Sequence, residues 1–453
     1  MSTWVVESIT VLGVKLVPGP IYTNQTTANI AGDPEAGNKH PSYLPAFVMA
    51  LFFIFGGITS LNDVIIPKLK ELFTLNYTQA MLIQFCFFTA YAVIGLPGAR
   101  IVKRVGYMRG AVVGLTTMMV GCLLFIPAST SARYELFLFA LFVLASGVVI
   151  VQVVANPLIS LLGPAKTAHS RLTFAQAFNS LGTTIFPIVG STLILGSLTN
   201  TSADQLSGEE LQAYRVAEAS AIVVGYSSLA IIIAVVAATV WWFRDALAKE
   251  THEESSLFGG FDLLKQPRFR FGAACIFFYV GAEVAIGSLI VNFLSQEQIL
   301  GIDEASAGKL VGLYFGGAMI GRFAGSALLR LVSPGKLLAA AASGAILLLL
   351  IAILTTGKVA GYSLLAVGLM NSIMFPTIFA LACEGLGSRL ADGSGIINVA
   401  IVGGAIVPLL TGVLADVSGV LAIAFFLPAL CYVMIAVYGW YARRPRSSHS
   451  DFA

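Results

Sequence analysis

The sequence predicts an all-α integral membrane protein with twelve transmembrane helices in two six-helix bundles. Three observations predict this fold class: the composition, twelve long apolar runs, and an internal repeat. Hydrophobic residues make up 57% of the 453 residues and charged residues only 11%, whereas a soluble domain carries about 25% charged residues. This composition argues against a cytosolic enzyme, a disordered protein and a nucleic-acid-binding protein.

Each apolar run is long enough to cross about 30 Å of hydrocarbon as a helix of about 20 residues. Helices are required because hydrocarbon cannot satisfy backbone polar groups. The alternating pattern of a transmembrane β-barrel is absent. The predicted spans are residues 44–66, 79–99, 110–128, 135–162, 172–198, 219–243, 271–295, 310–329, 337–356, 359–383, 393–415 and 419–442.

The distribution of Lys and Arg predicts the orientation of these spans. If both termini are cytoplasmic, 19 of the 26 basic residues lie in cytoplasmic segments, six lie in outer segments, and Arg322 lies within a span. We therefore expect an N-in, C-in topology in the inner (plasma) membrane. The expected organisation is a cytoplasmic tail (1–42), a first bundle (43–243), a cytoplasmic linker (244–270), a second bundle (271–442) and a short cytoplasmic tail (443–453).

The two bundles resemble each other at matching positions. Asn179 follows Pro157 by 22 residues, and Asn398 follows Pro376 by the same interval. A shift of about 220 residues maps one half onto the other. Duplicated halves with a binding site between them are typical of alternating-access transporters.

Apart from Glu135, the first residue of a span, three charged residues lie within predicted spans, where a charge costs from about 3 to over 10 kcal/mol. Asp63, which follows Asn62, is interpreted as a cation-binding carboxylate for H⁺ or Na⁺; the alternative is a structural ion pair. Glu283, one turn after Tyr279, can accept sugar hydroxyls, share in proton exchange, or pair with a base. Arg322 is interpreted as structural, reaching the headgroups; the alternative is a gate ion pair.

Uncharged amides form a second layer of polar groups within the spans. Gln152 and Asn156 are four residues apart, and Gln176 and Asn179 are three apart, so each pair shares one helix face. Amides both donate and accept hydrogen bonds, which suits a neutral, hydroxyl-rich ligand. The candidate substrate-binding residues are Gln152, Asn156, Gln176, Asn179, Tyr279, Glu283, Asn292, Asn371 and Asn398.

The sequence lacks the motifs that would indicate ATP hydrolysis, catalysis or a metal site. There is no Walker loop, and no Ser/His/Asp set lies at one membrane depth. All four histidines lie outside the apolar runs, so no intramembrane metal site can be assembled from them. We expect neither an enzyme nor a bound cofactor, and the coupling ion, H⁺ or Na⁺, stays open.

Six segments together resemble the major facilitator superfamily, and within it the fucose permease (fucose:H⁺ symporter) family, closest to its bacterial glucose/galactose transporter branch. The resemblance covers nearly all of residues 43–442. The segments are 61–67 (LNDVIIP), 84–88 (QFCFF), 152–157 (QVVANP), 171–180 (RLTFAQAFNS), 279–283 (YVGAE) and 374–379 (MFPTIF).

This resemblance implies proton coupling at Asp63, together with two departures from the fucose permeases. Gln152 stands where those permeases have a glutamate, and Glu283 stands where they have a glutamine. The loop between spans two and three usually contains Asp-Arg in the superfamily, whereas here Lys103-Arg104 lacks the acid.

We therefore expect a cation-coupled symporter of neutral monosaccharides, most of all glucose and galactose, that works by alternating access. The expected partners are the sugar and the lipid bilayer, with no nucleic acid, and a monomer is expected from the resemblance. One alternative is the same fold carrying L-fucose, N-acetylglucosamine or an exported drug. A more distant alternative is a non-transporting sugar sensor, which typically needs a signalling domain or a longer tail.

Overall fold

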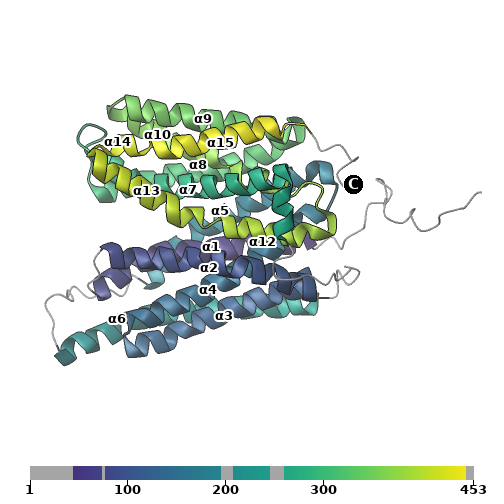
Figure 1. Ribbon diagram of the computed structural model, residues 1–453. Helices are drawn as coiled ribbons and strands as arrows, with labels where there is room; N and C mark the ends of the chain where they lie inside the picture. The colour runs from purple at the N-terminus through teal and green to yellow at the C-terminus, as the bar shows by residue number, and fades with distance from the viewer. Residues whose placement is uncertain (1–43, 74–76, 195–207, 245–259, 445–453) are drawn as a thin grey trace, which may run out of the picture. The chain divides into compact units, whose positions relative to one another are not determined.

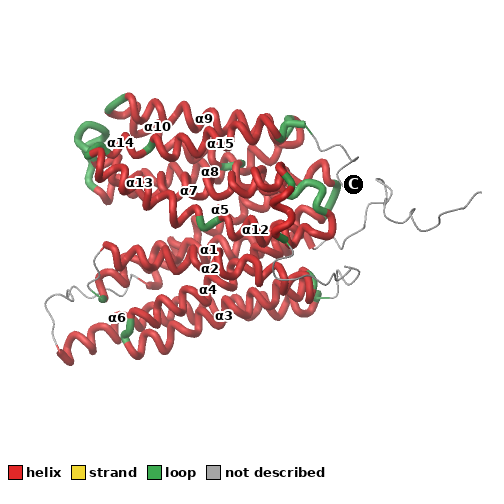
Figure 2. The backbone as a smooth tube through the Cα atoms, viewed as in Figure 1, coloured by secondary structure: helices red, strands yellow, loops and turns green. Residues whose placement is uncertain are grey.

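The computed structural model describes residues 44–73, 77–194, 208–244 and 260–444, and every regular element in these ranges is a helix (Figures 1 and 2). All of them belong to one compact unit, His40–Ala453. The N-terminal half comprises α1 (Leu44–Leu72), α2 (Tyr77–Val105), α3 (Tyr107–Ser131), α4 (Tyr134–Leu161), η1 (Ala165–Thr167), α5 (Ala168–Ile194) and α6 (Gly208–Trp242). The C-terminal half comprises η3 (Phe261–Lys265), α7 (Pro267–Ser295), α8 (Glu304–Leu331), α9 (Pro334–Leu354), α10 (Gly357–Asn371), α11 (Met374–Ala382), η4 (Gly387–Arg389), α12 (Leu390–Ala400), α13 (Gly403–Ser418), α14 (Leu421–Ala424) and α15 (Phe426–Tyr441).

Within the described ranges, nine helical segments are long and apolar enough to cross a membrane. The other three predicted spans fall on α1, α5 and α8, which are 29, 27 and 28 residues long. The predicted tail of residues 1–42 lies outside the described residues, as do most of the linker (244–270) and of the last tail (443–453).

Three of the predicted spans are broken helices. The span predicted over 359–383 consists of α10 and α11, which are separated at Ser372 and Ile373. Pro376 lies four residues after Ser372 and has no amide hydrogen to donate to the Ser372 carbonyl oxygen, so the α-helical bonding pattern stops here. The spans predicted over 393–415 and 419–442 likewise consist of two helices each. The freed carbonyl oxygen of Ser372 becomes important in the site described below.

Small residues allow one close helix crossing in each half. In the N-terminal half, α1 packs against α5, and a Cβ atom on Gly182 would collide with the carbonyl oxygen of Phe53. In the C-terminal half, α7 packs against α13, and a Cβ atom on Gly403 would collide with the carbonyl oxygen of Phe277. Glycine is therefore needed at both positions for the backbones to approach.

The two halves meet chiefly where α2 packs against α12 and α5 against α8, and α5 also contacts α11 while α4 contacts α12. In Figure 1, α5 and α12 lie between the purple-to-blue helices of the first half and the green-to-yellow helices of the second. At one end of these helices the interface contains Lys103, Arg330 and Arg389, each of which makes a polar contact. We call this end of the helices the basic end.

Candidate functional site

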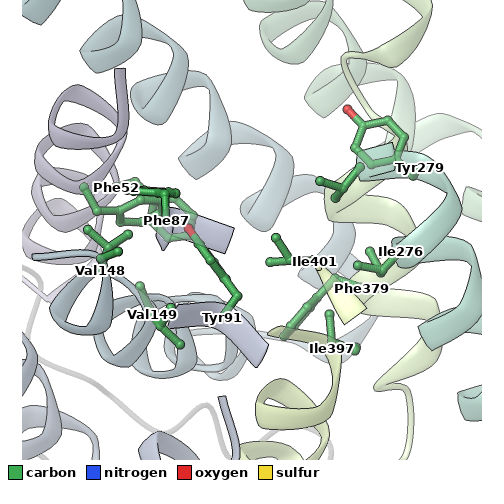
Figure 3. Close-up of a cluster of buried hydrophobic side chains, with 14 of the residues drawn as sticks. Phe52, Phe87, Tyr91, Val148, Val149, Ile276, Tyr279, Phe379, Ile397 and Ile401 are labelled. Carbon is green, nitrogen blue, oxygen red and sulfur yellow. The ribbon is translucent and has the colours of Figure 1, made fainter. Parts of the chain in front are cut away.

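Figure 3 shows buried apolar side chains from both halves, and several of the candidate polar residues lie on the same helices. On one side, Phe52, Phe87, Val148 and Val149 surround Tyr91; on the other lie Ile276, Phe379, Ile397, Ile401 and Tyr279. All of these side chains are buried. The apolar surroundings remove water, so each polar group among them needs a partner from the protein or from a ligand.

Asn371, the last residue of α10, is the centre of a hydrogen-bond network in the C-terminal half. Its Nδ2 donates to the Tyr314 hydroxyl (2.8 Å), and its Oδ1 accepts from the Tyr432 hydroxyl (2.7 Å). Its backbone oxygen accepts from the Tyr279 hydroxyl (3.1 Å). All four side chains are at most 1% exposed. The Asn371 amide is thus occupied by protein partners that come from α8 and α15.

Glu283 lies on α7, one turn after Tyr279, and is half-buried. The Tyr279 hydroxyl is also within hydrogen-bonding reach of the Glu283 carboxylate, and the charge of Arg322 acts on that carboxylate. Tyr279 has one hydroxyl hydrogen, which either Glu283 or the Asn371 backbone oxygen can accept. Glu283 therefore lies beside the internal network and beside Arg322, which contacts the other half.

Arg322, on α8, connects the two halves. Its Nε donates to the Ser372 carbonyl oxygen (3.3 Å), which the helix break before Pro376 leaves free. Its Nη1 donates to the Ser180 hydroxyl and to the Gln176 carbonyl oxygen (3.4 Å) on α5. The sequence analysis did not predict these contacts of Arg322 with the N-terminal half, because the spacing of residues on α8 does not show which side chains of α5 lie nearby.

The amides of the N-terminal half are less occupied than Asn371. Gln152 donates from Nε2 to the Tyr91 hydroxyl (3.0 Å). Asn179 donates from Nδ2 to the Phe52 carbonyl oxygen of α1 (3.4 Å), and Gln176 is buried with its backbone oxygen beside Arg322. Asn156 is only 1% exposed, yet neither its Nδ2 nor its Oδ1 has a partner.

Two other candidate amides, Asn398 and Asn292, lie on α12 and α7. Asn398 is buried on α12, where its Nδ2 donates to the Ser394 carbonyl oxygen of its own helix (2.8 Å) and its Oδ1 has no partner. Asn292 is exposed near the end of α7, nine residues after Glu283. Both lie on the helices that sequence analysis assigned to them, and their contact with a ligand stays a prediction.

The proposed coupling residues Asn62 and Asp63 lie on α1. Their side chains lie outside the described part of the structure, so their role also stays a prediction. In the residues that the structure describes, no group of three or more His, Cys, Asp and Glu side chains could hold a metal ion.

Sequence analysis did not single out Tyr91, Tyr314 and Tyr432 as partners of the candidate amides. No local signal could have found them, because each pairing joins helices that are distant in sequence. One signal did exist for Arg322: Pro376 frees a carbonyl oxygen, and a buried donor must satisfy it.

Comparisons with known proteins show that the chain is similar to membrane transporters. A family model described as Major Facilitator Superfamily matches residues 48–406. A glucose/galactose transporter of Brucella abortus is 48% identical over 417 residues, which cover 92% of this chain and 98% of that protein. An L-fucose-proton symporter of Escherichia coli is 33% identical over 428 residues, covering 91% and 96%. The crystal structure of the transporter FucP in the outward conformation superposes with a TM-score of 0.80 at 32% identity, covering 88% of this chain and 98% of that one.

Proposed function

Since the chain belongs to the major facilitator superfamily, we propose that it transports neutral monosaccharides, foremost glucose and galactose, by cation-coupled symport across the inner membrane. It is a sugar transporter and not an enzyme. The choice of glucose and galactose follows the 48% identity to the Brucella glucose/galactose transporter, which extends over nearly the whole of both chains.

The proposed topology has twelve spans with both termini inside. Nine spans are supported by the apolar segments within the described residues, and α1, α5 and α8 would be the other three. At 1.5 Å per residue, helices of this length exceed about 30 Å of hydrocarbon. The excess of Lys and Arg in alternate loops supports an inner location for the basic end.

The single observation that carries sugar binding is the unpartnered amide of Asn156. A buried polar group without a partner costs about 1–3 kcal/mol, and native proteins rarely tolerate it without a ligand or water. A sugar hydroxyl both donates and accepts, so it can satisfy Nδ2 and Oδ1 together. Gln152, Gln176 and Asn179 would complete the N-terminal side of the site, with Glu283 and Tyr279 opposite. Asn398, whose Oδ1 is free, is the further candidate of the C-terminal half. Asn371, whose side chain is occupied by Tyr314 and Tyr432, and the exposed Asn292 were also predicted from the sequence, but we do not expect them to contact the sugar.

Coupling would depend on the carboxylates. A cation bound at Asp63, with Asn62 beside it, would remove the cost of carrying a bare charge through the conformational change. Glu283 would contribute from the other half, where the charge of Arg322 acts on it. The halves would then rock about the site and expose it to each side of the membrane in turn.

Purified protein in proteoliposomes provides the test. Uptake of labelled glucose is measured with a pH gradient alone and with a sodium gradient alone, and unlabelled galactose, L-fucose and N-acetylglucosamine serve as competitors. We expect one gradient to drive accumulation, and glucose and galactose to compete best. Competition by L-fucose alone would instead assign the chain to the cargo of its 33% identical relative.

Asp63→Asn is the matching variant for coupling. Gradient-driven accumulation should fail while exchange of sugar across the membrane persists, because the variant removes the titratable group and leaves the amides in place. Asp416→Asn, an exposed acid near the end of α13, is the control and should accumulate sugar normally. Normal accumulation by Asp63→Asn would refute the coupling role.

A further inference from the structure

Two buried threonines, Thr173 on α5 and Thr377 on α11, have hydroxyl groups without a partner among the described residues. Both side chains are 0% exposed. A helical threonine can donate to a carbonyl oxygen in the preceding turn of its own helix. The equally buried Thr411, on α13, does so, with its Oγ1 2.8 Å from the Val407 carbonyl oxygen. Thr173 and Thr377 do not, so each leaves a hydroxyl for another partner.

The two threonines come from different halves and lie at the junction of α5, α8 and α11. A Cβ atom on Gly325, in α8, would collide with Cγ2 of Ile373 and would lie 4.0 Å from Cγ2 of Thr173. Thr377 follows Ile373 by one turn, and its amide donates to the Ile373 carbonyl oxygen (3.1 Å), so the two residues share a helix face. Helix α5 packs against both α8 and α11. The junction thus brings one unpartnered hydroxyl from each half to the contact between the halves.

Thr173 extends a polar face of α5 toward the basic end. It lies one turn before Gln176, which is one of the predicted sugar-binding amides, and on the same face. His169 lies one further turn toward the basic end, is 9% exposed and lies near Arg268 of α7. Its Nδ1 also has no partner within the described ranges. Polar groups that lack partners therefore continue beyond the amides, in the direction of the proposed inner side.

The chemistry of this junction suits a neutral hydroxyl group better than a cation. Each threonine hydroxyl can both donate and accept a hydrogen bond, and neither is charged. The guanidinium of Arg322 donates to the Gln176 carbonyl oxygen (3.4 Å), one turn from Thr173. Its positive charge disfavours a second cation at this place. A sugar, which offers several hydroxyl groups, can pair with both threonines.

We propose that Thr173 and Thr377 form an inner subsite for hydroxyl groups of the transported sugar, which the sugar contacts when the transporter is open to the inner side. This inference rests on the proposed transport function. Both hydroxyls are buried in the conformation described, and α5 must separate from α8 and α11 before a sugar can enter between them. The subsite should therefore act on sugar at the inner face and not on sugar that arrives from the outer face.

Transport measured separately at each face tests this subsite. Uptake of labelled glucose without an ion gradient is measured in right-side-out and inside-out membrane vesicles from a strain that lacks other glucose carriers. Thr173→Val and Thr377→Val keep the shape of the side chain and remove the hydroxyl. Each should raise the half-saturating glucose concentration at the inner face about five- to tenfold, as expected for one lost hydrogen bond. The value at the outer face should stay within about twofold.

Thr411→Val is the matched control, because Thr411 is as deeply buried but its hydroxyl bonds within its own helix. It should change neither face. Thr173→Ser and Thr377→Ser keep a hydroxyl and should retain the original value at the inner face. Size-exclusion chromatography checks that each variant folds.

Valine variants that behave like Thr411→Val at both faces, or that change both faces equally, would overturn the inference. The two hydroxyls would then serve packing or hold water alone. Failure of the original protein to show saturable glucose uptake in either kind of vesicle is a different result. It would refute the proposed transport function, and the inner subsite with it.

Discussion

One buried asparagine in each half, Asn371 and Asn156, shows two different environments for an amide. In the C-terminal half, both polar atoms of the Asn371 side chain form hydrogen bonds with tyrosine hydroxyls from two other helices. In the N-terminal half, Asn156 is equally buried and has no partner for either side-chain atom. These two amides are not counterparts in the repeat, and their contacts differ: the Asn371 side chain is held within the packing of its own half, whereas the Asn156 side chain is free.

This difference separates rigidity from binding. A buried network in which every polar group has a partner holds its helices in a fixed arrangement. A buried polar group without a partner instead favours binding of a ligand, because the ligand's hydrogen bond removes the cost of leaving that group unpaired. We therefore expect the C-terminal half to supply a rigid wall with the charges of Glu283 and Arg322, and the N-terminal half to supply the amides that bind sugar hydroxyls.

The largest expected effect comes from Asn371→Leu, which keeps the branched shape of the side chain and removes the amide. The hydroxyls of Tyr314 and Tyr432 would then be buried without a partner. The free energy of unfolding should therefore fall by about 2 kcal/mol, a typical cost of unpaired buried polar groups and of lost hydrogen bonds between membrane helices. Sugar affinity per folded molecule should stay within about twofold. Unfolding in mixed detergent micelles and calorimetric titration with glucose measure the two quantities.

Adding Tyr432→Phe to Asn371→Leu provides the matched control, because it removes one of the orphaned hydroxyls and should recover part of the lost stability. The opposite outcome, unchanged stability with affinity reduced more than tenfold, would make Asn371 a ligand contact and end the contrast between the halves.

Asn156→Leu should give the reverse pattern. Removal of an unpartnered amide should leave the free energy of unfolding unchanged or raise it by about 1 kcal/mol. Loss of a hydrogen bond to the sugar should weaken binding about tenfold, which corresponds to about 1.4 kcal/mol. The same titration and unfolding assays apply.

Tyr226→Phe distinguishes a ligand contact from any buried orphan. The Tyr226 hydroxyl is also buried without a partner, but the ring stacks on Phe125 in the contact between α3 and α6. Its replacement should preserve sugar affinity. If Asn156→Leu preserves affinity as well, the free amide is not a sugar contact.

The sequence was sufficient for the helical membrane fold and for the superfamily, because both depend on composition and on motifs that stay local in the chain. Even the break between α10 and α11 has a local signal in Pro376. Helix pairing has no such signal. The repeat equates Asn179 with Asn398, yet Asn179 donates to α1 and Asn398 to its own helix. Which partner an amide finds depends on the rotation and neighbours of its helix.

Lys103 illustrates the same limit for charges. The sequence analysis noted that the loop after α2 lacks the acid usual in the superfamily, and this absence said nothing about what the lysine contacts. The structure supplies the acid from Asp392, 289 positions away along the chain. Spacing within one helix predicts faces, whereas ion pairs across the halves require the packed molecule.

The smallest expected effect comes from Asn292→Ala, and it tests whether the wall of the C-terminal half is as rigid as proposed. Asn292 is exposed, and nine residues on a straight helix place it roughly half a turn away from Glu283. Helix α7 runs without a break from Pro267 to Ser295. Glucose affinity should therefore change less than about twofold, and stability by less than about 0.5 kcal/mol. A tenfold loss of affinity would mean that α7 rotates or unwinds during transport, and the C-terminal half would then be a mobile, ligand-binding partner of the N-terminal half.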